Sequence, residues 1–385
     1  MASTTPHRTN VRFLTSFAFL SLLLSAAWPL AAQQAAVAAD EAGLLHQAEA
    51  FEARIASRAS RVRDPVLDSY LRELVCKIDA QRCTDVRIYV IREPYFNALM
   101  APNGAMVLFT GLLLRMEDEA QLVFVLGHEL SHLRSRDSLA GWRRLKAAGN
   151  ASIALQIVGG AVGGSALAAV AGLGALAPAF AFSRDQERAA DDYGLQRLAE
   201  LGYDTHRAGQ SWADIWREEQ ARERKLSSGI FATHPASEER AKRLKAAATS
   251  GGETRSEAFH AVIAPHRLDW LEDEVGRRHY GQTKVLLERL RRLPFAPAEI
   301  DYAIGEMYRR RAREGDLERA QEHYETSTSA PDAPARAWRG LGLSAARRGD
   351  RTVAAKALNR YLELAPHAPD RDLIEMELED QSAAP

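Results

Sequence analysis

The stretch 127-Gly-His-Glu-Leu-Ser-His-132 decides the fold, because residues 128–132 carry the pattern HExxH. Residues four apart on an α-helix lie on the same face, so His128 and His132 can offer two neutral imidazoles to one Zn²⁺ ion. Glu129 follows the first histidine and could serve as the general base on a water molecule at that ion. The alternative is a chance match, since short motifs also occur in unrelated chains.

The residues before this motif favour a buried helix. Asp118 is a suitable N-cap, and the mostly apolar run from Glu119 to the motif contains only Gly127 as a poor helix former. Two histidines and a glutamate within such a helix need partners that offset their desolvation. We therefore expect a polar metal site inside an otherwise apolar helix.

A second helix is expected to begin after Ser183, which forms a capping box with Gln186. Glu187 and Asp191 lie four residues apart and so share a face of this helix. We expect Glu187 to complete a His₂Glu zinc site, and Asp191 to accept the free ring N–H of a ligand histidine, which we take to be His128. The alternative is an exposed, charged helix. A further helix carries Trp212 and Trp216, which we interpret as core residues.

Taken together, these motifs resemble a known family. HELSH, the segment SRDQERAAD at residues 183–191, and Thr233-His234-Pro235 followed by Arg240 are similar to gluzincin metalloproteases of the HtpX, Oma and CAAX-prenyl-protease type. With the segments described below, the chain most resembles the bacterial periplasmic BepA-like proteases. The resemblance covers residues 60–245 as the peptidase and 267–368 as repeats. It implies a mainly α (α+β) fold, in which a metalloprotease domain with a small β-sheet precedes an α-helical repeat domain.

The resemblance also implies roles for two later residues. In the family a histidine like His234 lies close to the zinc, where it either stabilises the oxyanion of the tetrahedral intermediate or closes the site as an inhibitory fourth ligand. Without the resemblance, His234 would be interpreted as a loop histidine beside a proline. Arg240 is expected to brace the site by an ion pair with Glu187 or Asp191.

A small β-sheet is expected between residues 86 and 109. Residues 86–91 alternate as a strand does, and residues 96–100 and 105–109 flank an Asn-Gly turn, which predicts a hairpin. In the family a strand of this kind borders the active site. The resemblance therefore implies that Asn97, Ala98 and Leu99 form an edge to which an unfolded substrate adds as a strand. An ordinary hairpin that covers the catalytic helix is the structural alternative.

Residues 1–32 have the pattern of a secretory signal. Arg8 and Arg12 precede an apolar run over residues 13–27, and Leu-Ala-Ala at residues 30–32 suits a cleavage site. The alternative is a membrane anchor, for which the apolar run is short. We expect an exported, periplasmic protein.

The two cysteines indicate the cellular compartment, and the net charge limits the kinds of partner. Cys76 and Cys83 are the only cysteines of the 385-residue chain, and in an oxidising compartment we expect them to form a disulfide rather than a buried free pair. A formal net charge of −1 argues against nucleic acid as a partner.

The segment of residues 151–182 contains no charged residue and is rich in glycine and alanine. It is long enough to span a bilayer but only weakly hydrophobic. Three interpretations stay open: a buried helical hairpin, a loop that touches or enters a membrane, and a mobile lid over the active site.

Beyond residue 246 the sequence repeats. Two sets of residues recur at intervals of 34: Gly281, Gly315 and Gly349, and Trp270, Ile304 and Trp338. This is the period of tetratricopeptide repeats, in which stacked helical hairpins form a concave face that binds peptide segments or partner proteins. The alternative is a helical cap that stabilises the peptidase.

The sequence thus predicts a signal peptide (1–32), a zinc metalloprotease domain (40–245), a linker (246–266), repeats (267–368) and an acidic, frayed tail (369–385). The predicted function is a zinc-dependent endopeptidase that cleaves unfolded or misassembled outer-membrane proteins, with repeats that bind substrate or the outer-membrane assembly machinery; this cellular role rests on the resemblance alone. One alternative is a chaperone or scaffold whose metal site is closed by His234. Another is a zinc hydrolase of small molecules, against which the edge strand and the repeats argue.

Overall fold

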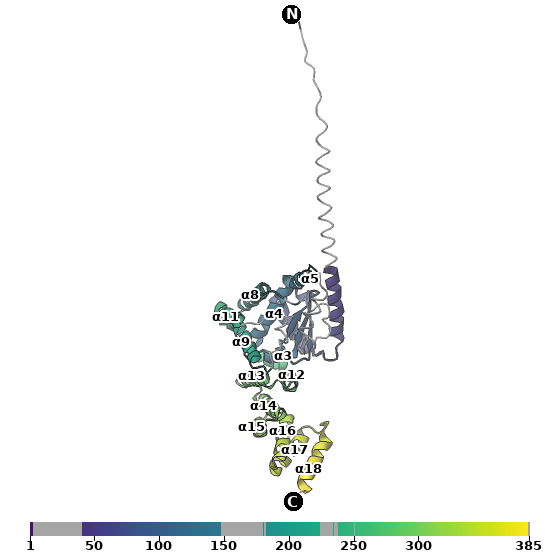
Figure 1. The fold of residues 1–385 in the computed structure, drawn as a ribbon, viewed down its shortest axis with the longest axis vertical. Helices are drawn as coiled ribbons and strands as arrows, with labels where there is room; N and C mark the ends of the chain where they lie inside the picture. The colour runs from purple at the N-terminus through teal and green to yellow at the C-terminus, as the bar shows by residue number, and fades with distance from the viewer. Residues whose placement is uncertain are drawn as a thin grey trace.

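The computed structural model describes residues 1–2, 41–147, 180, 182–223, 234, 238–249 and 251–383, and the account that follows concerns these residues. Two expectations lie almost wholly outside them: the signal peptide at residues 1–32, and the segment 151–182 apart from Phe180 and Phe182. The described residues are mainly helical, with one small sheet and a C-terminal run of paired helices (Figure 1), which confirms the predicted fold class.

The helices follow one another along the chain over residues 41–57, α2 (Pro65–Ile78), α3 (Thr110–Arg115), α4 (Glu119–Arg134), α5 (Asp137–Ala147), α8 (Arg184–Glu200), α9 (His206–Gln220), α11 (Glu238–Ala247), α12 (Ser256–Gly276), α13 (Tyr280–Leu290), α14 (Pro297–Arg311), α15 (Asp316–Thr328), α16 (Ala335–Arg347), α17 (Arg351–Leu364) and α18 (Arg371–Ala383). A 3₁₀ turn, η1, covers Cys83–Asp85.

The sheet has the strand order β1-β3-β2, where β1 is Arg87–Ile91, β2 is Ala98–Met100 and β3 is Ala105–Phe109. β1 pairs with β3 in parallel and β2 pairs with β3 antiparallel, so the predicted hairpin is confirmed and β2 lies at an edge. Gly104 closes the hairpin with a φ of +89°, and a Cβ there would lie 2.2 Å from the backbone oxygen of Asp85. Only glycine suits this turn.

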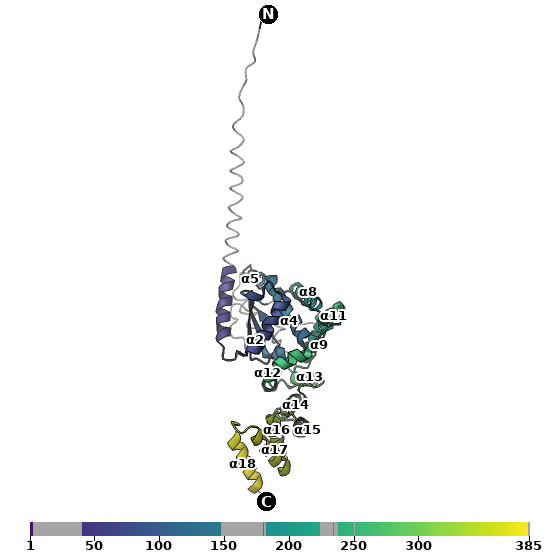
Figure 2. The same cartoon turned by 180° about the vertical axis from the view of Figure 1, so that it is seen from behind.

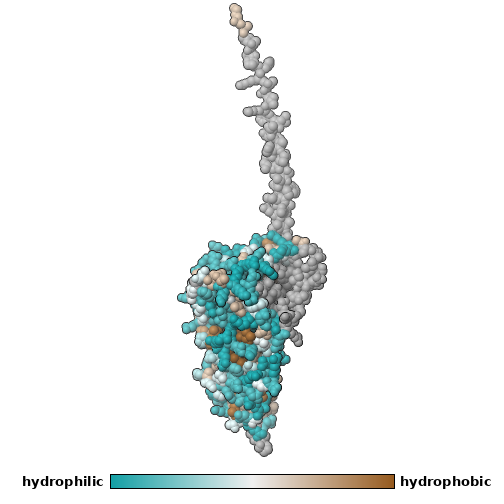
Figure 3. All heavy atoms as spheres, turned by 60° about the vertical axis from the view of Figure 1, so that its left-hand side comes forward, coloured by the Kyte–Doolittle hydropathy of each residue, from teal (hydrophilic) through white to brown (hydrophobic). Residues whose placement is uncertain are grey.

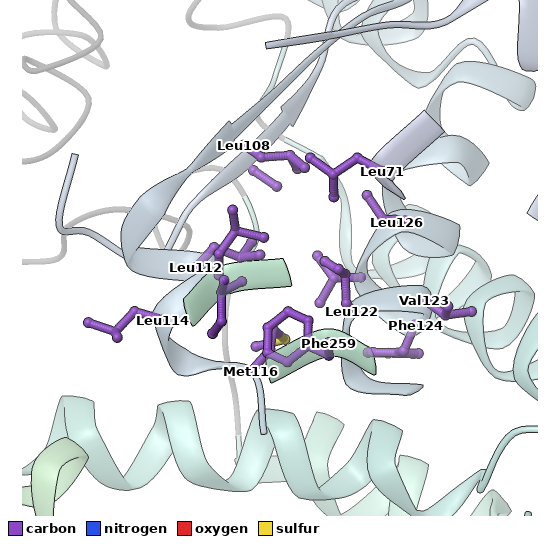
Figure 4. Close-up of a cluster of buried hydrophobic side chains, with 14 of the residues drawn as sticks. Leu71, Leu108, Leu112, Leu114, Met116, Leu122, Val123, Phe124, Leu126 and Phe259 are labelled. Carbon is purple, nitrogen blue, oxygen red and sulfur yellow. The ribbon is translucent and has the colours of Figure 1, made fainter. Parts of the chain in front are cut away.

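Helix α4, which carries the HExxH motif, lies at the centre of the core. Asp118 caps it as predicted, because its side chain accepts a hydrogen bond from the backbone N–H of Gln121. One face of the sheet packs against the helix of residues 41–57, and the other faces α2 and α4. In Figure 4, Leu108 of β3, Leu71 of α2 and Leu126 of α4 surround one common apolar interior.

Helices α4 and α8 approach each other closely at two glycines. A Cβ on Gly127 would lie 3.1 Å from the Cα of Gly194, and a Cβ on Gly194 would lie 2.9 Å from the backbone oxygen of Phe124. Because neither residue has a side chain, the two backbones can lie almost in contact. This approach brings the motif of α4 opposite the acidic first half of α8.

A disulfide joins Cys76, near the end of α2, to Cys83 of η1. The segment between them carries Asp79, whose carboxylate accepts a hydrogen bond of 2.8 Å from Arg134, the last residue of α4. The cross-link therefore lies against the C-terminal end of the metal-motif helix.

Helix α12 begins at Ser256, within the range expected to be a linker, and its Phe259 is buried in the same core as α4 (Figure 4). A network of buried charges also joins the first helix pair, α12 and α13, to the region that surrounds α4, the N-terminal region. Arg115 of α3 bonds to Glu218 of α9 at 2.7 Å and to Glu274 of α12 at 2.9 Å. Arg289 of α13 bonds to Glu117 and Glu218, each at 3.0 Å.

The remaining helices, α14 to α18, extend away from the region that contains the sheet and α4 (Figure 2). The ring of Tyr324 on α15 fills the space beside two glycines, since a Cβ on Gly305 or Gly340 would lie within 2.7 Å or 2.5 Å of it. α18 is helical where we expected a frayed acidic tail; its Ile374 is buried against α17, which offsets the cost of ordering this segment. The predicted domain boundaries and repeat type stay predictions.

The described part of the chain contains no helix that is both long and apolar enough to cross a bilayer. The face shown in Figure 3 is largely hydrophilic, with small hydrophobic areas.

Candidate metal centre

Four buried side chains converge at one point between α4 and α8. They are His128 and His132 of α4, Glu187 of α8, and His234, and each offers one ligand atom within 4.8 Å of the others. The Nε2 atoms of His128 and His132 are 3.2 Å apart, and Nδ1 of His234 lies 3.2 Å from Nε2 of His128 and 2.8 Å from Oε1 of Glu187.

Two aspartates orient the histidines of α4. Nδ1 of His128 lies 3.1 Å from Oδ1 of Asp191, and Nδ1 of His132 lies 2.8 Å from Oδ2 of Asp137. A carboxylate can only accept, so each Nδ1 carries the proton and each Nε2 presents a lone pair. Two lone pairs 3.2 Å apart in a buried site repel each other unless a cation lies between them.

The donor set and its spacing suit zinc. Imidazole nitrogen and carboxylate oxygen are common zinc ligands, and bonds of ~2.0–2.1 Å at tetrahedral angles place ligand atoms ~3.3 Å apart. Five of the six pairs among the four side chains have ligand atoms 2.8 to 3.7 Å apart, which brackets that value, and all four ligand atoms lie within 4.8 Å of one another. The residues therefore fit a zinc ion, with His234 in the fourth position.

Arg240 of α11 braces the carboxylates of α8. Its Nε and Nη2 donate to Asp191 at 3.0 and 2.6 Å, and its Nη1 lies 2.6 Å from Oε2 of Glu187. Burial would raise the pKa of Asp191, but His128 and Arg240 outweigh it and hold that pKa well below its ordinary range. Burial likewise opposes ionisation of Glu187, yet His234, His128 and Arg240 lower its pKa to about 2. Both carboxylates are thus ionised at neutral pH.

The site favours a positive charge and contains an unused acceptor. Burial would lower the pKa of His234, but the carboxylates of Glu187 and Glu129 outweigh it and raise that pKa. Burial lowers the pKa of His132, which keeps its imidazole neutral as a ligand requires. Oε1 of Glu129 is buried, has no hydrogen-bond partner within the described part of the chain, and lies 3.6 Å from Nε2 of His234. A general base for an incoming water needs such a free oxygen.

Three residues at the site were not assigned to it from the sequence. Asp137 holds His132 and itself accepts a bond from Gln186 of α8 at 2.7 Å. The ring of Phe182 stacks on that of His132 with centroids 3.8 Å apart, and Trp212 of α9 lies against His128 and Arg240. Asp137 had a usable signal, since it is the first acidic residue after the motif. The two aromatic contacts had none, because they depend on how helices pack.

The predicted substrate edge lies on β2. Ala98 and Leu99 are at most 2% exposed, main chain included, and their side chains lie in the two cores, so a substrate strand could add to β2 only after this edge is uncovered. Asn97 is fully buried, and neither Nδ2 nor Oδ1 of its side chain has a hydrogen-bond partner in the ranges that the structure describes. Phe96 lies edge-on to Trp212, which links the start of this strand to the metal centre.

Comparison with known proteins agrees with this geometry. The model of peptidase family M48 matches residues 61–248. A stretch of 195 residues, 46% of this chain, is 27% identical to a Vibrio cholerae protein named "Putative beta-barrel assembly-enhancing protease", of which it covers 38%. Over 159 residues the chain is 28% identical to metalloprotease LoiP of Escherichia coli, covering 41% of this chain and 60% of that protein. A 45-residue stretch, 12% of this chain, is 49% identical to human mitochondrial metalloendopeptidase OMA1, of which it covers 9%.

Proposed function

Because residues 61–248 belong to peptidase family M48, and because His128, His132 and Glu187 meet in one buried site, we propose that the protein is a zinc-dependent endopeptidase. The convergence of these three side chains from two helices is the observation that carries the proposal. The matched stretches span 38% of the Vibrio cholerae relative and 60% of LoiP, so the activity of the whole protein is part of this proposal.

His128, His132 and Glu187 would hold the ion, with His234 as a fourth ligand that can leave. When bound, zinc supplies Lewis-acid chemistry, by polarising the scissile carbonyl and lowering the pKa of a water molecule. Glu129 accepts the proton of the attacking water through its free Oε1 and later returns it to the leaving amine. Asp191 and Asp137 keep both imidazoles in the required tautomer throughout.

His234 gives the site a closed form. Its Nδ1 occupies the place beside Glu187 where a water molecule and the substrate carbonyl must enter. We infer that His234 withdraws before each cleavage, and that its raised pKa reflects the negative charge it neutralises in the closed form. Removal of His234 should therefore open the site.

The proposed substrates are unfolded or misassembled proteins of the bacterial envelope, including outer-membrane proteins. The edge position of β2 in the sheet supports a substrate that binds in extended form, through main-chain bonds made once this buried edge is uncovered. The disulfide fits an oxidising compartment such as the periplasm. The name of the Vibrio cholerae relative supports a link to β-barrel assembly, and the paired helices beyond α12 offer a surface for substrate or for that machinery.

A direct test measures zinc content and the cleavage of unfolded casein by the purified protein. We expect one zinc per chain, and we expect Glu129→Gln to keep the zinc while losing at least about 10²-fold in kcat. His234→Ala should cut faster than wild type. A protein that retains no metal, or a Glu129→Gln variant that cuts normally, would contradict the proposal.

The closed site favours one alternative, a chaperone or scaffold in which the helix pairs bind protein and the metal is structural. It predicts that neither wild type nor His234→Ala cuts casein, and that casein binding survives removal of zinc by a chelator.

A further inference from the structure

Trp212 lies in α9, is 6% exposed, and contacts three parts of the site. Its ring is 4.0 Å from the guanidinium carbon of Arg240, and its centroid is 6.4 Å from that of the His128 ring at an interplanar angle of 67°. The ring of Phe96 meets it edge-on at 6.3 Å and 77°. The Trp212 ring therefore does more than fill the core, because one of its faces covers the Arg240 guanidinium.

The contact with Arg240 bears directly on the ligands. The edge of the guanidinium plane bonds to Asp191 and reaches Glu187, while the indole covers its face. A planar guanidinium held by stacking has few alternative orientations, and an aromatic face excludes the water that would screen its ion pairs. The indole thus restricts Arg240 to the plane in which it meets both carboxylates.

The contact with His128 completes the arrangement. Nδ1 of His128 bonds to the same Asp191 that Arg240 holds, so the indole touches both a ligand and the cation that positions its partner. Phe96, which directly precedes Asn97 and β2, packs edge-on against the indole. One aromatic ring therefore contacts Phe96 just before the edge strand, His128 of α4, and Arg240 of α11, which in turn bonds to the carboxylates of α8.

We propose that Trp212 is a positioning residue of the metal centre, which acts through Arg240 to hold Glu187 and Asp191 in the geometry that binds zinc. This inference rests on the proposed zinc site, but it concerns the strength of metal binding and is testable without proteolysis. Its ring face carries the proposed role, because Nε1 of Trp212 has no hydrogen-bond partner among the residues that the structure describes.

The test compares Trp212→Leu, Trp212→Phe and the control Trp216→Leu in the full-length protein. Trp216 lies one turn further along the same helix and is half-buried, so its loss reports general effects on α9. Zinc affinity is measured by competition with a chromogenic chelator, and kcat and KM are measured with a fluorescent peptide from casein. We expect Trp212→Leu to weaken zinc binding at least about 10-fold, in the range found when outer partners of metal ligands are removed. Trp212→Phe and Trp216→Leu should stay within about threefold of wild type.

Zinc affinity in Trp212→Leu within threefold of wild type would overturn the inference, as would a Phe variant as weak as the Leu variant or an equal loss in Trp216→Leu. If Trp212→Leu does not fold, Arg240→Lys decides, because lysine keeps the charge but not the plane. Normal zinc affinity in Arg240→Lys would then overturn it. Wild-type protein that binds zinc but cuts no peptide would refute the proposed function and leave the zinc comparison valid.

Discussion

Replacing Arg289 by methionine should destabilise the peptidase region, although Arg289 lies outside the match to the M48 family. Its guanidinium is almost fully buried and donates to Glu117, Glu218 and the backbone oxygen of Arg115, each at 3.0 Å. Methionine keeps the apolar stem but leaves three buried carboxylates, those of Glu117, Glu218 and the more distant Asp214 at 3.8 Å, with one cation fewer.

Removing one partner from a buried ion pair costs roughly 3–5 kcal/mol. Here Glu117 keeps Arg207 at 2.7 Å and Glu218 keeps Arg115 at 2.7 Å, so we expect the lower end, about 3 kcal/mol. Urea unfolding followed by circular dichroism measures this difference. The control is Arg360→Met, whose ion pair with Glu363 is exposed and should contribute less than about 1 kcal/mol.

The location of the loss is the second measurement. Because Glu117 directly precedes Asp118, the N-cap of α4, we expect Arg289→Met to increase hydrogen exchange in α4 as well as in α13. An unfolding free energy within about 1 kcal/mol of wild type, or faster exchange in α13 alone, would refute the view that this network ties the first helix pair to the metal-motif helix.

Three further outcomes are expected. Burial would raise the pKa of Glu274, but Arg115 and Arg277 lower it from 4.5 to about 2. Ionised Glu274 therefore stabilises the fold above pH 4.5, and this stability is lost as the pH falls toward 2. The difference in urea midpoint between wild type and Glu274→Gln should shrink between pH 6 and pH 3, and a constant difference would contradict this. Asp137→Asn should weaken zinc binding about 10- to 100-fold in a chelator competition, and unchanged affinity would show that His132 needs no such partner. Gly194→Ala should destabilise by about 1–2 kcal/mol in thermal unfolding, because the new methyl group meets the backbone of α4, whereas Gly43→Ala, with open space around it, should be neutral or stabilising by up to about 1 kcal/mol.

Much of the site could be predicted because its signals are local. The N-cap at Asp118, the capping box of Ser183 and Gln186, and the turn at Gly104 are each set by residues within a few positions of one another. Local signals place helices and turns correctly, and the i, i+4 rule then assigns the side chains that share a face.

The contacts that the sequence did not reveal join residues far apart in the chain. Arg289 bonds to Glu117 across 172 positions, and Trp212 meets Arg240 only because α9 and α11 pack together. Nothing in the spacing of arginines and glutamates selects which of them will pair, since the sequence is rich in both. The place of α12 in the core was missed for the same reason: its apolar residues fit either a repeat or the peptidase.

The paired glycines of α4 and α8 have a consequence for ion selectivity. Gly127 and Gly194 set the distance between two backbones, and through them the distance between the imidazoles and the carboxylate. Helix packing fixes the distance between the imidazoles and the carboxylate, and this distance changes little with the bound ion because packed interiors resist deformation. A compact cluster rich in nitrogen donors disfavours calcium and magnesium, which require six or more oxygen ligands. The close helix contact at Gly127 and Gly194 therefore favours zinc over those two ions at this site.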